Sequence, residues 1–229
     1  MTPDHWDAEL AWLQLHDSAF PSGRFVHSNG LEAWLAAHPD ADADVVADVV
    51  ETHLRHNVAT LDAVCVAHAF RAGSVDELVR LDHLLRAHKL SAAARTASES
   101  CGRQLALAAR RTLPPLADEE FLARVTAGET PGNLAVVEGV VHRALSIDLP
   151  RAVVGHLRSA CSGMLSAAVR LGRLGPLEAQ RRIFAAAPVL AQLARTAAGT
   201  PLDDIAAVTP QLDVYAMRHE TTAARLFST

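Results

Sequence analysis

Apolar residues recur along most of the chain at the spacing of amphipathic helices. The clearest stripe lies between residues 44 and 71 and consists of Val46, Val50, Leu54, Leu61 and Cys65. Residues three, four or seven positions apart share one face of a helix, so this spacing predicts a helix with a buried side. No segment shows the sustained apolar–polar alternation, rich in β-branched residues, that indicates a strand. The pattern therefore predicts an all-α fold without a sheet.

Helix-breaking residues divide the pattern into about ten predicted helices. Gly175 followed by Pro176 closes one helix and opens the next. Pro188 lies inside a helical run and predicts a kink or a break. The chain has no internal repeat, low-complexity tract or long linker, so we predict one multi-helix bundle domain over residues 1–229. The predicted helices cover residues 7–16, 29–37, 44–71, 75–88, 91–112, 118–127, 133–146, 150–173, 176–197 and 213–227.

The composition indicates how such a bundle is packed. Half of the 229 residues are hydrophobic but only 4% are aromatic, so the core must consist mainly of Ala, Leu and Val. Ala and Leu are strong helix formers, and small side chains allow helices to approach closely. Cys65, Cys101 and Cys161 are widely spaced in helical segments, which favours buried free thiols in a reducing compartment over disulfides.

Charge and hydropathy argue against two classes of partner. The 26 acidic residues outnumber the 21 basic ones, and Lys and Arg form no block that would bind a phosphate backbone. We therefore expect no nucleic-acid partner. Charged residues interrupt every apolar segment before the roughly 18 residues that span a bilayer, and the first ten residues lack the pattern of a secretory signal. These features predict a soluble, cytoplasmic protein that does not bind a membrane.

The sequence carries no recognised catalytic or cofactor-binding motif. It contains no G-x-x-x-x-G-K-[ST], G-x-S-x-G, H-E-x-x-H or C-x-x-C pattern. His53 and His56 share a helix face as a metal-binding pair would, but no cysteine or carboxylate completes a ligand set around them. We interpret that face as solvated. We therefore expect no enzyme and assign no catalytic residue, cofactor-binding residue or metal ligand.

The stretch DSAFPSGRFVHSNGLE, residues 17–32, is unusual in a helical protein. It combines one proline, two glycines and three serines with an arginine and a histidine. A connecting loop needs only a few helix-breaking and hydrogen-bonding residues. The density of such residues in this loop, which we call the signature loop, favours a functional role.

Two basic segments and the C-terminus are further candidates for contacts. Lys89 and Arg95 are embedded among small residues, which fits either close helix packing or a surface for an acidic partner. Arg170 and Arg173 are three residues apart and border the Gly175–Pro176 junction, which fits either a solvated face or a docking edge. The end of the chain combines charged and apolar residues, so it packs either onto its own domain or into the groove of a partner.

Six segments in this order together resemble the UreF family of urease accessory proteins. The resemblance spans almost the whole chain, and its first and last segments are the most specific. The segments are QLHDSAFPSGRFVHSNGLE at 14–32, RTAS at 95–98 after Lys89 with GRQL at 102–105, GNLAVVEGVV at 132–141, SAAVRLGRLGPLEAQ at 166–180, LDVYAMRHE at 212–220 and RLFS at 225–228.

The resemblance implies a non-enzymatic, all-helical chaperone for assembly of the urease nickel centre. Members of the family form a homodimer, bind the accessory protein UreD (called UreH in some organisms) and recruit the nickel-carrying GTPase UreG. The assembly docks on apo-urease. The absence of a P-loop motif fits this division of labour, because the nucleotide belongs to UreG. The chain itself would then need no cofactor, and the assembled complex would handle the nickel.

The resemblance also implies which residues bind partners. Asn29 is expected to cap the second helix, with His27, Ser28 and Glu32 at its entrance. Two residues depart from the family pattern, since Arg24 stands where relatives have a small residue and Trp34 where a Tyr is common. The complete set of candidate partner-binding residues is His27, Ser28, Glu32, Trp34, Lys89, Arg95, Arg170, Arg173, Arg218, His219, Glu220 and Arg225.

Three alternative functions stay open. The chain would regulate UreG hydrolysis if Arg170 or Arg173 stabilised the transition state. It would be a nickel-binding metallochaperone if His27 or His219 bound the metal. An unrelated helical enzyme is disfavoured by the missing motifs. In the preferred scaffold interpretation, residues 1–20 and 210–229 are loosely held in the isolated protein and become ordered when UreD binds.

Overall fold

The computed structural model describes residues 5–113, 119–219 and 226–228, and this part of the chain contains helices, turns and bends but no strand. The predicted all-α fold is confirmed. The α-helices are α1 His5–Leu15, α2 Leu31–Ala37, α3 Ala43–His53, α4 Ala63–Arg71, α5 Val75–His88, α6 Ala92–Thr112, α7 Glu119–Ala127, α8 Leu134–Ala144, α9 Leu149–Arg170, α10 Pro176–Ala185, α11 Ala187–Gly199 and α12 Pro210–His219.

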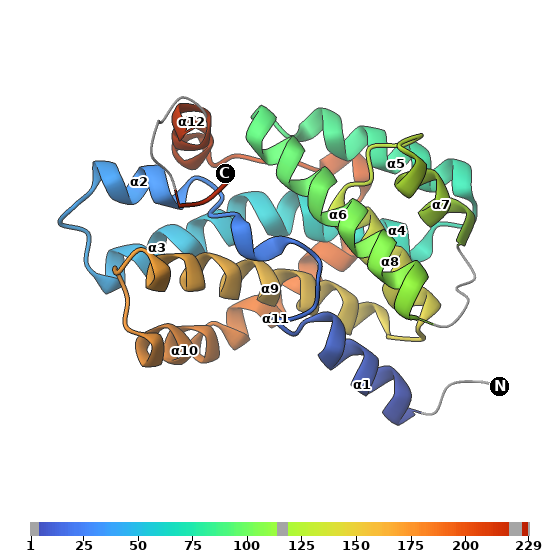
Figure 1. Ribbon diagram of the computed structural model, residues 1–229, viewed down its shortest axis with the longest axis horizontal. Helices are drawn as coiled ribbons and strands as arrows, with labels where there is room; N and C mark the ends of the chain where they lie inside the picture. The colour runs from blue at the N-terminus through green and yellow to red at the C-terminus, as the bar shows by residue number, and fades with distance from the viewer. Residues whose placement is uncertain (1–4, 114–118, 220–225, 229) are drawn as a thin grey trace.

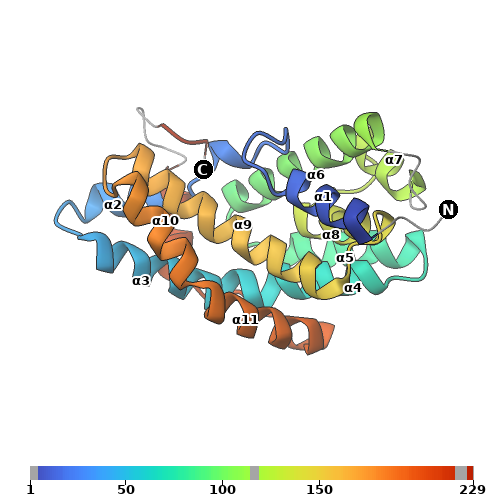
Figure 2. The same cartoon turned by 90° about the horizontal axis from the view of Figure 1, so that it is seen from below.

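Helices α4 and α8 form the centre of the bundle. α4 packs against α8, α9 and α11, and α8 packs against α4, α6 and α9. All residues of α8 from Ala135 to His142 are buried. Figures 1 and 2 show α9 running along the bundle, with α12 and α2 at one end and α5 and α7 at the other. Among the described residues, no helix has the length and apolar sequence needed to cross a membrane.

Small residues bring the central helices together, as the composition predicted. A Cβ at Gly139 of α8 would stand only 2.6 Å from the carbonyl oxygen of Val66 in α4. Because real Cβ atoms do not approach other atoms so closely, only glycine fits there. The three cysteines are free and buried, also as predicted. Burial raises the pKa of the Cys101 and Cys161 thiols to about 11.

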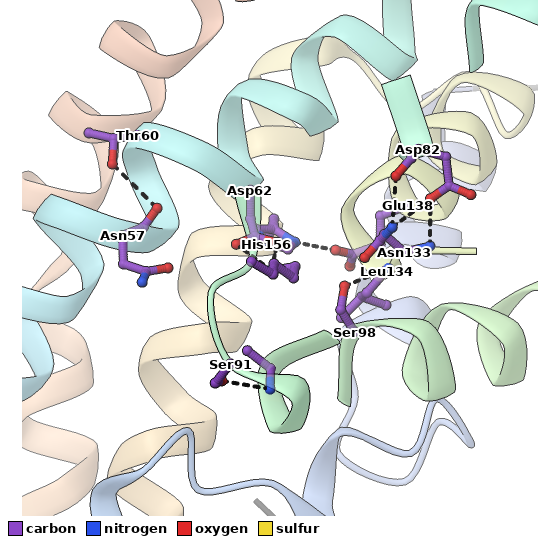
Figure 3. Close-up of polar contacts among 12 residues, drawn as sticks. Asn57, Thr60, Asp62, Asp82, Ser91, Ser98, Asn133, Leu134, Glu138 and His156 are labelled. Carbon is purple, nitrogen blue, oxygen red and sulfur yellow. Dashed lines mark hydrogen bonds and ion pairs between the residues drawn. The ribbon is translucent and has the colours of Figure 1, made fainter. Parts of the chain in front are cut away.

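The turn at residues 128–133 is anchored by a buried carboxylate (Figure 3). Asp82 of α5 is fully buried and accepts hydrogen bonds from the Thr130 hydroxyl at 2.6 Å and the Gly132 amide at 2.6 Å. It also accepts from the backbone and side-chain amides of Asn133, each at 2.8 Å. These charge-assisted bonds compensate the cost of burying the carboxylate and fix the start of α8 against α5.

Proline marks one helix boundary as predicted, and two predicted helix ends were wrong. α10 ends at Ala185 and α11 begins at Ala187, with Pro188 in its first turn. The helix predicted over 150–173 ends at Arg170, and Gly172 follows with a left-handed φ of 70°. The helix predicted over 213–227 spans Pro210–His219 instead, and Leu226 and Phe227 lie in a bend outside any helix.

The long helix predicted over 44–71 contains a π-helical segment, Leu54–Asp62, between α3 and α4. The extended residues after α11 pair with it. The carbonyl of His56 accepts from the Val208 amide at 2.8 Å, and the carbonyl of Thr60 accepts from the Ala206 amide at 3.1 Å. π-helical turns leave the regular ladder and are frequent near functional sites. Asp62, its last residue, pairs with Lys89 at the junction between α5 and α6.

The predicted solvated face at His53 was wrong. The His53 side chain is buried, and its Nδ1 lies 3.3 Å from the hydroxyl of Thr209, which precedes α12. Burial lowers the pKa of His53 to about 4. In the sequence, His53 lies beside the stripe that contains Val46 and Val50. The segment that buries its side chain is the one at Thr209, more than 150 positions away.

Candidate partner-binding surface

The signature loop departs from helical geometry because its glycines and Asn29 adopt left-handed backbone conformations. Gly23 has φ 75°, Asn29 φ 53° and Gly30 φ 82°. Gly30 is also in close contact with α12, since a Cβ there would stand 2.6 Å from the carbonyl oxygen of Leu212. The glycines therefore have two physical roles. They allow the chain to turn into α2, and they allow α12 to pack against that turn.

Glu32, in the first turn of α2, binds the end of the chain. Its carboxylate accepts a hydrogen bond from the Leu226 amide at 2.7 Å and another from the Phe227 amide at 3.0 Å. The Ser228 amide donates to the carbonyl of Val26 in the signature loop at 2.8 Å. Residues 226–228, which we call the tail, therefore dock on the chain's own domain.

Arg170 covers the aromatic ring of the tail. The Phe227 side chain is 2% exposed, and the guanidinium carbon of Arg170 lies 4.0 Å from the ring centroid. A cation over an aromatic face contributes roughly 0.5–2 kcal/mol, depending on how far the pair is removed from water. Two candidate residues that are far apart in sequence, Glu32 and Arg170, thus meet at the tail. We call Glu32, Arg170 and the tail the tail clamp.

Trp34 lies beneath this surface rather than on it. Its side chain is 3% exposed and stacks on His38, with ring centroids 4.3 Å apart and an interplanar angle of 16°. His38 in turn meets the edge of Tyr215 in α12, at a centroid distance of 5.7 Å. Trp34 therefore joins α2 to α12. A direct contact of Trp34 with a partner stays a prediction that would require α12 to move.

The entrance to α2 differs from the predicted cap. Asn29 does not cap the helix, because the N-cap position is occupied by Gly30, which has no side chain to accept a hydrogen bond. Ser28 is fully buried, and its hydroxyl accepts from the Glu32 amide at a long 3.4 Å. His27 is half-buried, and this burial lowers its pKa. These residues support the loop from inside.

Lys89 and Arg95 stabilise the junction between α5 and α6. The Lys89 ammonium lies 2.7 Å and 3.0 Å from the two carboxylate oxygens of Asp62, in a pair whose side chains are 10% and 11% exposed. Arg95 donates to the carbonyls of Lys89 at 2.7 Å and Leu90 at 3.0 Å. The structure thus gives both residues an internal structural role. Their binding of an acidic partner stays a prediction.

Arg173 lies past the end of α9 and does not share a helical face with Arg170. It donates to the carbonyls of His38 at 3.0 Å and Ala41 at 3.3 Å, and also to that of Pro39. Arg173 therefore holds the connection between α2 and α3. The spacing of three residues predicted that Arg170 and Arg173 share one helix face. They do not, because α9 ends at Arg170.

Two of the remaining candidates, Arg218 and His219, belong to the last turn of α12. Arg218 is exposed, with its guanidinium carbon 5.8 Å from the ring centroid of Tyr215. The side chain of His219, together with the whole of Glu220 and Arg225, lies outside the described residues. Among the described residues, no group of three His, Cys, Asp or Glu is arranged to hold a metal ion.

A buried charge network under the signature loop was not predicted from the sequence. Glu138 of α8 is 1% exposed and forms an ion pair with Arg24 of the loop. Its carboxylate also contacts Nδ1 of His156 in α9 (Figure 3). Burial alone would raise the pKa of the Glu138 carboxyl, but Arg24 and His156 together hold it well below its usual range. The sequence signal was a lone acidic residue in the apolar run LAVVEGVV.

A cavity of about 150 Å³ lies between the loop, the π-helical segment, α6, α9 and α12. Arg24 and His27 line it from the loop, Asp62 and Lys89 from the π-helical segment and the α5–α6 junction, and Asp213 from α12. Desolvation raises the pKa of the Asp213 carboxyl, although Lys89 opposes the shift. The signature loop is therefore supported by polar contacts on the inside, while the tail covers part of its outside.

Comparison with known proteins decides the family. A sequence model of the UreF family matches residues 41–187. The chain belongs to the UreF family. It is 30% identical over 218 residues to the urease accessory protein UreF of Corynebacterium efficiens, an alignment that covers 95% of both chains. The protein of the same name from Corynebacterium glutamicum is 30% identical over 221 residues, covering 96% of this chain and 98% of the relative. The one from Bacillus sp. (strain TB-90) is 29% identical over 221 residues, covering 95% and 97%.

Membership of the UreF family confirms the resemblance seen in the motifs. The chain is thus a urease accessory protein rather than urease itself. The structure also gives a physical reason for Arg24, one of the two residues that depart from the family pattern. Arg24 neutralises Glu138 in the interior, so the departure is tied to a buried partner.

Proposed function

We propose that this UreF-family chain is a scaffold that holds UreD (or UreH) and the GTPase UreG in register while nickel is inserted into apo-urease. The chain makes and breaks no bond itself and works as a cytoplasmic homodimer. The observation that carries the proposal is the tail clamp. It brings the signature loop, the start of α2, the end of α9 and residues 226–228 to one surface.

The tail clamp has the physical properties of a contact that a partner can tighten or replace. It consists of one buried aromatic ring, two amides bound to one carboxylate and one backbone bond to the loop. Burial of the Phe227 side chain and its polar contacts favour docking, but ordering the tail costs roughly 1–2 kcal/mol per residue, so the docked tail is only modestly favoured. A partner that contacts both the tail and the loop would stabilise the docked state. This supports the prediction that the C-terminal segment gains order when UreD binds.

The test is urease activation in cells that express the chain with UreD and UreG. Glu32→Gln keeps the shape of the side chain but removes the charge that both tail amides require. We expect about tenfold less UreG in the purified complex, because a hydrogen bond to a charged group contributes roughly 1.5–3 kcal/mol. Urease activation should fall with it. Glu129→Gln, at an exposed position after α7, is the matched control. Normal assembly with Glu32→Gln would contradict the proposal.

The position of Arg170 favours one second candidate, namely regulation of UreG hydrolysis by an arginine. Arg170 covers Phe227, so displacement of the tail would make its guanidinium available to a partner. Turnover by UreG should be compared with the unsubstituted chain, Arg170→Ala and Arg170→Lys. Loss of stimulated hydrolysis with an intact complex favours this candidate. Loss of the complex with normal turnover favours the scaffold.

A further inference from the structure

A chain of hydrogen bonds connects the N-terminal segment to the core through the half-buried His16 and the buried His142. The backbone carbonyl of Glu138 can only accept a hydrogen bond. Nδ1 of His142 therefore carries a proton and donates it to this oxygen at 2.7 Å. The Nε2 of a neutral His142 is then bare and accepts from Nε2–H of His16 at 3.0 Å. The Nδ1 of His16 accepts in turn from the Ser159 hydroxyl at 2.8 Å. The contacts are thus satisfied by one set of tautomers with both rings neutral.

The contacts join three segments of the fold. His16 follows the last residue of α1, His142 belongs to α8 and Ser159 to α9. The His16 ring lies where a side chain at Gly155 of α9 would be, since a Cβ there would overlap the ring. Trp12 of α1 adds a bond from its indole N–H to the Arg151 carbonyl at 3.1 Å. α1 is therefore fixed to the core largely through the surroundings of His16.

We propose that the His16–His142 pair is a pH-operated latch, which holds α1 and the signature loop on α8 and α9 at neutral pH and releases them on acidification. The proposal concerns the isolated chain and goes beyond the scaffold function. It follows from the geometry of the pair. A proton added to Nε2 of His142 would place two N–H groups against each other at a contact of 3.0 Å, with no acceptor between them.

The positively charged groups around the pair lower the pKa of both histidines, and only Glu138 raises it. His16 faces His142 and Glu138 from α8, Arg24 from the loop and His156 from α9, and His142 faces Glu138, Arg24 and His156. Burial, together with the positive charges of Arg24 and His156, lowers the pKa of His16 to about 3 and that of His142 to about 4. Glu138 opposes the shifts, but Arg24 and His156 already neutralise it.

The sign of the pH effect follows from these shifts. An exposed histidine has a pKa of about 6.5, so the released state binds more protons than the latched state in the window between about 6.5 and the latched values of about 3 and 4. At pH 5 the equilibrium for release should rise roughly 30-fold for each histidine exposed, compared with pH 7.5. Arg24 links the loop to the same event, because a proton on His16 repels the guanidinium that holds the loop to Glu138.

Hydrogen exchange tests the latch in the full chain at pH 7.5 and pH 5.0, after correction for the intrinsic pH dependence of exchange. Amides of residues 5–30 should lose protection at pH 5.0 by roughly 30-fold or more, and they should exchange faster than those of α4 and α9. His142→Gln supplies an acceptor for His16 that does not titrate. In this variant the loss of protection between pH 7.5 and pH 5.0 should therefore be about 30-fold smaller. His83→Gln, at an exposed position of α5, should leave it unchanged. Equal pH dependence in all three proteins would overturn the proposal.

A second measurement needs no substitution and guards against a variant that fails to fold. Nitrogen chemical shifts of the ring atoms distinguish the two neutral tautomers. At pH 7 they should show a proton on Nε2 of His16 and on Nδ1 of His142. Neither ring should take up a proton above pH 5. A ring that titrates near pH 6.5 in the folded protein, or the opposite tautomers, would refute the latch.

Discussion

Gly102 of α6 lies directly against the backbone at Gly132, just before α8. A Cβ at Gly102 would overlap the Gly132 carbonyl oxygen and stand 2.7 Å from the amide nitrogen of Leu134. These neighbours are backbone atoms, which cannot move aside as a flexible side chain would. The residue that is unfavourable inside an isolated helix is therefore the one that allows α6 and α8 to pack.

Gly102→Ala should destabilise the protein despite the higher helix propensity of Ala. Overpacking of this kind costs roughly 1–3 kcal/mol, which exceeds the gain of about 1 kcal/mol from replacing Gly in a helix. Chemical denaturation followed by circular dichroism measures the difference. A variant as stable as the unsubstituted chain would show that α6 and α8 can separate without cost.

Gly163→Ala should have the opposite effect and serves as the matched control. Gly163 lies within α9, and a Cβ there meets no other atom within 4 Å. The added methyl group restricts the unfolded chain without a clash, so we expect the free energy of unfolding to rise by roughly 0.5–1 kcal/mol. The same denaturation experiment applies. A loss of stability would mean that the space beside Gly163 is filled in solution.

The sequence predicted helix boundaries that depend on neighbouring residues, but it did not predict burial and ion pairs that depend on segments far apart in the chain. α5 begins and ends at the predicted residues, and the break near Pro188 follows from the missing amide of proline. The burial of His53 and Trp34 was missed because α12 and the residues before it cover both. The network at Glu138 was missed for the same reason, since its partners Arg24 and His156 come from separate segments.

The structure brings together only some of the candidate partner-binding residues. Glu32 and Arg170 were selected by family resemblance, and the structure brings both to the tail. Arg173 was selected with Arg170 on the assumption of an unbroken helix, and it holds a neighbouring loop instead. Periodicity identifies residues that share a helix face, but it cannot show where the chain beyond the helix returns.

Phe227→Ala should release the tail, because it removes the ring that lies under Arg170. Loss of a buried Phe ring costs roughly 1.5–3 kcal/mol of docking free energy, which shifts the docked fraction by about tenfold or more. Leu226→Ala is the matched control, because Leu226 is 61% exposed. Hydrogen exchange at the amides of Leu226 and Phe227 reports the docking. If both variants protect these amides equally, the ring does not hold the tail.

Lys89→Met should destabilise the protein by roughly 3–5 kcal/mol, because it leaves the Asp62 carboxylate buried and unpaired. The double variant Lys89→Met with Asp62→Leu should recover most of the loss, since an apolar pair of similar volume needs no charge compensation. Denaturation of the two single variants and the double variant gives the coupling energy. A coupling energy near zero would show that water screens the pair in spite of its low exposure.

The stability of the whole protein should fall as the pH drops from 7 to 5, in part through His53. Burial holds the pKa of His53 near 4 in the folded state, so unfolding takes up a proton in the window between about 4 and 6.5. At pH 5 this single group should lower the free energy of unfolding by about 2 kcal/mol relative to pH 7. His53→Gln should remove that share of the pH dependence, whereas His56→Gln, three residues later and exposed, should retain it. Denaturation curves at the two pH values make the comparison, and identical pH dependence in both variants would exclude His53 as a source of the effect.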